Sequence, residues 1–261
     1  MESKDFVTSG ELQVSLNGLF DLLFKAISHP SIDVCGIALE AFLDIAPSNT
    51  ELATRLLPYL QGKAIIPFQF THHAGGFEEF LDFRDNLLTD ALIACYTGCS
   101  LFYLTSCGSA IEEFCQASTS PHIPHQLEAA LFCLVAISDT VERAVDKQVL
   151  HKQLENITSA LKRNAFSTTS NPFVMARMCS FISHYATSLA QCQHEPMFEM
   201  ACELVIASFN LSITECETTP FPSAKVVSVM SEASDALKHL LCSAPSRFSA
   251  PAALTVLEST F

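Results

Sequence analysis

Residues 123–138 read IPHQLEAALFCLVAIS, and their pattern decides the fold class. Apolar side chains recur three or four residues apart, which places one continuous stripe along an α-helix. The stripe comprises Leu127, Ala130, Leu131, Leu134 and Val135. Pro124 stands in the first turn, where its missing N–H would have no intrahelical partner. The stretch therefore predicts a helix with a broad apolar face.

The same pattern recurs along the chain and indicates a repeat. First helices are predicted over residues 32–45, 80–96, 123–138, 173–189 and 223–241. Their starts lie roughly 43 to 50 residues apart, near the period of about 40 to 47 of HEAT and armadillo arrays. Second helices are predicted between them over 12–27, 51–59, 100–115, 147–160 and 196–209, with a last one over 250–257. Loops are expected at 61–76, 116–122, 163–171 and 213–222.

A lone helix pair cannot cover its apolar face, but stacking against the next pair creates one continuous core. We therefore predict an all-α fold, a HEAT/armadillo-like solenoid of helical hairpins (an α-α superhelix) with about five repeats. A single solenoid would span residues 1–261, with 1–10 as a candidate disordered segment. A compact helical bundle is the alternative.

Charge limits the classes of partner. Lys and Arg number 14 against 28 Asp and Glu, which gives a formal charge of −14. Phosphate backbones and anionic membranes select the opposite sign, so we expect no direct nucleic-acid binding and no membrane binding. A basic protein segment would instead be attracted.

Two apolar features have structural interpretations. Residues 91–111 carry no charge, but small and hydroxyl side chains dilute the segment, which favours two buried helices meeting near Gly98 over a membrane span. The eleven cysteines form no Cys-x-x-Cys pair and lie mostly among apolar neighbours, as at Cys35, Cys133, Cys179 and Cys202. They are typical of buried thiols in an intracellular protein, and residues 1–10 lack the apolar region of a secretory signal.

Few residues are candidates for a metal site or a catalytic nucleophile. His72 and His73 precede Gly75 and Gly76 in a predicted loop, but a zinc site needs three or four ligands and no cysteine pattern accompanies them, so exposed loop histidines are expected. The spacing of Cys95, Cys99, Cys107 and Cys115 puts them near one helical face, which favours core packing over a nucleophile.

No phosphate-binding glycine loop and no Gly-x-Ser-x-Gly elbow occurs. We therefore predict that the chain is not an enzyme, with no catalytic, cofactor-binding or metal-binding residue and no cofactor. The residues that bind a partner are not identified at this stage.

Four acidic residues lie inside apolar helices: Glu40, Asp90, Glu128 and Glu232. They could form an acidic ladder along one wall of the superhelix that meets basic cargo. Independent exposure of each carboxylate to solvent is the preferred interpretation.

Two segments resemble a known family. Residues 77–92, FEEFLDFRDNLLTDAL, and 124–137, PHQLEAALFCLVAI, resemble nuclear transport receptors of the importin-β superfamily, in particular the transportin-SR-like branch. In that branch a Phe-x-x-x-Arg-like opening precedes a helix with Glu-Ala-x-Leu-Phe. Matching residues here are Phe80 and Arg84, then Glu128, Ala129, Leu131 and Phe132. The resemblance extends from about residue 27 to 248.

The resemblance implies a protein-binding HEAT-repeat module from the middle of an importin-β-type or transportin-type receptor, acting in nuclear transport of protein cargo between nucleus and cytoplasm. Its implied partners are cargo with basic segments, the GTPase Ran and nucleoporins. The chain departs from the family in having no Trp, and its amino-terminal Ran-binding region is not found. The alternative is an armadillo-like structural scaffold or complex subunit without a transport role.

Overall fold

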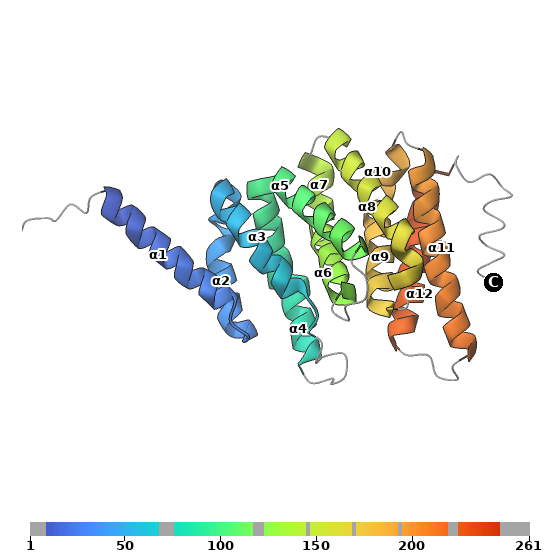
Figure 1. Cartoon of the computed structure of the whole chain (residues 1–261), viewed down its shortest axis with the longest axis horizontal. Coiled ribbons are helices and arrows are strands. Elements are labelled where there is room, and N and C mark those ends of the chain that lie inside the picture. The colour runs from blue at the N-terminus through green and yellow to red at the C-terminus, as the bar shows by residue number, and fades with distance from the viewer. Residues whose placement is uncertain are drawn as a thin grey trace, which may run out of the picture.

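The computed structural model describes residues 9–67, 76–116, 123–144, 147–168, 171–192, 195–218 and 224–245. Over these ranges every regular element is helical and no strand occurs, so the predicted all-α class is confirmed. The helices lie side by side along the long axis of the molecule, in the order of the chain (Figure 1).

The elements follow one another with short connections. In the first half they are α1 (Ser9–Ile27), α2 (Ile32–Leu43), the 3-10 turn η1 (Ala46–Ser48), α3 (Thr50–Ala64), α4 (Phe77–Phe83), the π-helical turn η3 (Arg84–Leu88) and α5 (Thr89–Gln116). In the second half they are α6 (Ile123–Ala136), α7 (Ser138–Ala144), α8 (Lys147–Thr168), α9 (Pro172–His184), α10 (Ala186–Gln191), α11 (Glu195–Thr218) and α12 (Ala224–Ser243).

Helix starts agree closely with the sequence predictions, and several helix ends do not. The predicted loops at 61–76, 163–171 and 213–222 are wrong at their beginnings, because α3, α8 and α11 continue to Ala64, Thr168 and Thr218. A final helical turn needs no apolar pattern, since backbone hydrogen bonds alone extend a helix that has already formed. The predicted helix over 173–189 is broken at Tyr185, and the helix predicted over 250–257 lies outside the described residues.

The uncharged stretch 91–111 is bent, as predicted. Cys99 has φ −143° and ψ 42°, which interrupts α5 directly after Gly98. Within the described residues, the helical stretches Phe77–Gln116 and Pro196–Thr214 are long and apolar enough to cross a membrane, but 50% and 44% of their apolar windows are buried inside the structure. Core helices meet the same length and composition criteria, so these stretches are weak indicators of a membrane span.

The helices pack in two rows. One row runs through α3, α5, α8 and α11, and the other through α6, α9 and α12, with contacts between the rows. The helices that contact each other extensively are also close in chain order. The buried core is continuous from Phe24 in α1 to Leu240 in α12.

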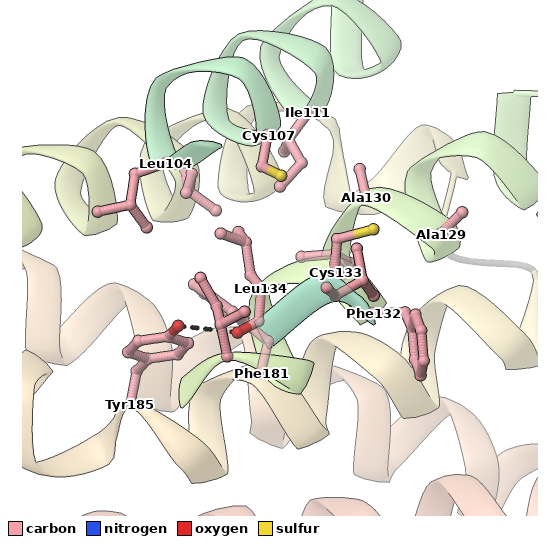
Figure 2. Packing of buried hydrophobic residues seen from close by; sticks show 14 of the residues in the cluster. Leu104, Cys107, Ile111, Ala129, Ala130, Phe132, Cys133, Leu134, Phe181 and Tyr185 are labelled. Carbon is pink, nitrogen blue, oxygen red and sulfur yellow. Dashed lines mark hydrogen bonds between the residues drawn. The ribbon is translucent and has the colours of Figure 1, made fainter. Parts of the chain in front are cut away.

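Helix α6 is held from both sides by tyrosines. The hydroxyl of Tyr103 in α5 donates to the carbonyl oxygen of Cys133 (2.8 Å), and that of Tyr185, after α9, donates to the carbonyl oxygen of Leu134 (2.8 Å, Figure 2). The last carbonyls of a helix have no intrahelical donor, so side chains must satisfy them when they are buried. Both tyrosines are fully buried and cross-link α6 to its neighbours.

Replacing Tyr185 with Phe should lower the free energy of unfolding by about 1–3 kcal/mol, because the buried carbonyl of Leu134 then lacks a donor. Urea denaturation followed by circular dichroism measures the change. Tyr59→Phe is the control, since Tyr59 is 39% exposed and its substitution should change stability by less than about 0.5 kcal/mol. Equal effects of the two substitutions would contradict the expected role of the Tyr185 hydroxyl.

Candidate functional site

A buried ion-paired cluster joins three helical segments. Arg84 Nη2 in η3 lies 2.6 Å from Glu128 Oε2 in α6, and Arg177 Nε in α9 lies 3.0 Å from Glu128 Oε1. Side-chain exposure is 1% for Arg84, 3% for Glu128 and 24% for Arg177. Both carboxylate oxygens are thus engaged, and two guanidinium groups share one buried carboxylate.

An aromatic ring completes this Arg84–Glu128–Arg177 cluster. The guanidinium carbon of Arg84 lies 4.0 Å from the centre of the Phe132 ring, and that of Arg177 lies 5.0 Å from the same centre. Phe80 offers Arg84 a second ring at 5.9 Å. Cations at these distances are attracted to the face of an aromatic ring, which offsets part of the cost of burying them.

Local structure explains the position of Arg84. The π-helical turn adds a residue to the helical circuit, so Thr89 Oγ1 donates to the carbonyl oxygen of Arg84 five residues earlier (2.9 Å). Such turns locally change the direction of side chains and often occur at functional sites. Four of the six residues matched in the sequence analysis, Phe80, Arg84, Glu128 and Phe132, lie together in this buried cluster.

A pocket of about 290 Å³ opens beside the cluster. Its walls come mainly from α4, α6, α9 and α12, and half of its lining side chains are apolar. It is lined by Ile66, Phe77, Leu81, Arg84, Glu128, Pro172, Phe173, Ala176, Arg177, Ser180, Ser228 and Glu232. Two arginines and two glutamates among these residues balance in charge, so the pocket does not select a ligand by charge.

The four acidic residues from the sequence do not share one environment. Glu40 and Asp90 are exposed to solvent, in agreement with the preferred interpretation of the sequence. Glu232 is half-buried and lines the pocket beside the cluster. The prediction that Glu128 faces solvent is wrong, because the carboxylate is buried between two arginines. A ladder through all four is also wrong, since a neutralised Glu128 cannot attract a partner. Its arginine partners lie 44 and 49 residues away, and this spacing, close to that of the predicted helix starts, is the signal that sequence reasoning missed.

The four cysteines of α5 lie in the core, as the sequence predicted. Cys95, Cys99, Cys107 and Cys115 are buried, and the Sγ atoms of Cys95 and Cys99 are 4.0 Å apart. Burial raises the pKa of the Cys115 thiol to about 11, while a hydrogen bond with Cys95 lowers the pKa of Cys99. The Cys99 thiol is 5% exposed, which leaves little access for a substrate.

Other polar groups offer little chemistry. Ser183 Oγ lies 2.6 Å from Nδ1 of His239 in a polar pocket that Asp139 also lines, but no hydrogen bond joins Asp139 to this imidazole. A nucleophilic triad needs that third contact to orient the base. Within the described ranges no three His, Cys, Asp or Glu side chains are placed to hold a metal ion. His72 and His73 lie outside those ranges.

Comparison with known proteins gives no assignment. No family model matches the chain, and no curated protein matches it.

Proposed function

We propose that the chain is a HEAT-type solenoid that binds protein. The observation that carries this proposal is the spacing of its long-range side-chain bonds. Arg84 and Glu128 are 44 residues apart, Glu128 and Arg177 are 49 apart, and the Tyr185 hydroxyl bonds a carbonyl 51 residues earlier. Equivalent positions in neighbouring repeats of about 40 to 47 residues would be connected in this way.

The family resemblance extends the proposal to importin-β-type nuclear transport. Four residues of its two motifs pack into one cluster, which supports a shared structural role in holding successive helix pairs together. With a charge of −14, the surface would attract cargo with basic segments. The module would act without chemistry in nucleus and cytoplasm, with Ran and nucleoporins as further partners.

Two binding assays test this proposal. We expect the chain to be retained on immobilised phenylalanine-glycine repeat peptides but not on alanine-glycine peptides. We also expect that GTP-locked Ran changes which proteins are recovered from nuclear and cytosolic extract, with GDP-bound Ran as control. Recovery of the same proteins under both conditions, together with no retention on the repeats, would count against a transport receptor.

An armadillo-like scaffold or complex subunit is the second candidate. Leu19 and Leu22 on α1 are 50% and 63% exposed, and Val34 on α2 is 38% exposed. Apolar side chains concentrated at one end of a molecule favour a permanent protein contact there. A scaffold would keep its partners whether or not Ran-GTP is present.

A further inference from the structure

A groove of about 530 Å³ runs between α2 and the helix formed by α4 and η3. It is lined by Ile32, Asp33, Gly36, Ile37, Glu40, Glu79, Asp82, Phe83, Asn86 and Leu87. Phe83 is buried and Leu87 half-buried, so they form an apolar floor, while Ile37 is 72% exposed. An isoleucine so exposed beside an apolar floor leaves a surface that another apolar side chain can cover.

The walls of this α2–α4 groove are acidic. Asp33 and Glu40 on α2 and Glu79 and Asp82 on α4 are all exposed, and none forms an ion pair with another described residue. Among the described residues, no Lys, Arg or His lines the groove. Asp33 and Glu40 are seven residues apart, about 10 Å along the helix axis, with Ile37 between them on the same face.

The other pockets of the described residues differ from this groove in charge or in apolar lining. The pocket beside the Arg84–Glu128–Arg177 cluster contains both signs in equal number, and the one along α8 is lined by Lys147, His151, Lys152 and Glu155. A pocket at the end of α5 is also acidic, through Glu112 and Glu113, but no apolar side chain lines it. The overall negative charge is therefore not distributed evenly over every pocket. The α2–α4 groove combines an apolar centre with uncompensated carboxylates on both sides.

We propose that the α2–α4 groove binds a basic amphipathic helix of a partner protein, an inference that rests on the proposed function in protein binding. An aliphatic side chain of this helix covers Ile37 and Leu87. Lysines or arginines about two turns apart on the same face then lie near the carboxylates of Asp33 and Glu40. Exposed ion pairs contribute little individually, so the apolar contact sets much of the affinity and the charges select the partner.

A labelled helical peptide of about 14 residues, with arginines seven positions apart flanking a leucine, is the probe. Fluorescence anisotropy measures its binding to the full chain. The double substitution Glu40→Lys and Asp82→Lys should weaken binding at least about tenfold, and Ile37→Ser about fivefold. All three residues are exposed, so circular dichroism should show an unchanged fold.

The matched control is Glu113→Lys with Asp235→Lys, which gives the same net charge through exposed residues of α5 and α12 that do not line the groove. It should change binding less than about twofold, because exposed charges beyond about 10 Å are largely screened. Equal weakening by both double variants would overturn the inference, as would a wild-type dimer that Ile37→Ser converts to monomer.

The two proposals fail separately. If the groove variants bind the peptide like the wild type while Ran-GTP still releases extract proteins, the groove inference fails and the transport proposal stands. If peptide binding depends on the groove but Ran-GTP and the phenylalanine-glycine repeats have no effect, the transport proposal fails. Binding of a peptide with the same composition in scrambled order, at equal affinity, would also overturn the groove inference.

Discussion

Glu128→Gln should lower the free energy of unfolding by about 3–5 kcal/mol, which is one of the two largest effects expected for single substitutions in this chain. The amide keeps the shape of the carboxylate but removes its charge. Arg84, whose side chain is 1% exposed, would then be a buried cation without a counter-ion. In a chain of this size the midpoint of thermal unfolding should fall by about 10 °C.

A matched control uses Glu113, an exposed glutamate of α5. Glu113→Gln should change stability by less than about 0.5 kcal/mol. A second comparison separates charge from packing: the triple variant Arg84→Met, Glu128→Leu and Arg177→Met removes every charge of the cluster. It should be at least about 2 kcal/mol more stable than Glu128→Gln, because apolar replacement of a buried ion cluster is often neutral. A triple variant as unstable as the single one would contradict the electrostatic explanation.

The cluster also illustrates what the sequence could predict. Apolar periodicity and proline positions located the helix starts, because both depend on neighbours within a turn or two. Glu128 was expected at the surface, since a carboxylate among apolar residues has no local partner. Its partners lie 44 residues before it and 49 residues after it, and only the packing of helices brings them together.

The candidate sites were harder to foresee than the fold. Glu40 was singled out as one of four similar carboxylates, yet its neighbours in the groove are Glu79 and Asp82 on another helix. Which exposed carboxylates face each other depends on the rotation of each helix about its own axis. Periodicity defines an apolar face only to within a residue or two, so this rotation is not determined by the sequence pattern.

The bend in α5 was predictable because its cause is local in sequence. Gly98 stands in a long uncharged helical stretch, and glycine in a helix interior costs about 0.5–1 kcal/mol relative to alanine. Such a residue indicates either a bend or a close approach of two backbones. The structure contains both, with the bend at Cys99 and the approach at Gly98.

Gly98→Ala should destabilise the chain by about 3 kcal/mol, at the upper end of the usual cost of overfilling a packed interior. A methyl group on Gly98 would lie 2.2 Å from the carbonyl oxygen of Ala46 in η1 and 2.8 Å from Cβ of Ala53 in α3. The first contact is with backbone, so no side-chain rotation relieves it. Either α5 or the turn between α2 and α3 must move.

The same substitution at Gly18 in α1 should raise the free energy of unfolding instead of lowering it. Apart from the backbone of its own helix and its chain neighbours, no atom lies within 4 Å of the position that its Cβ would take, so Gly18→Ala should stabilise the helix by about 0.5–1 kcal/mol. Thermal unfolding of the two variants under identical conditions compares them directly. If Gly98→Ala raises the midpoint as Gly18→Ala does, then α5 does not pack this closely on η1 and α3. That result would contradict the proposed stacking of helix pairs at this point of the chain, and both proposed binding functions depend on this stacking.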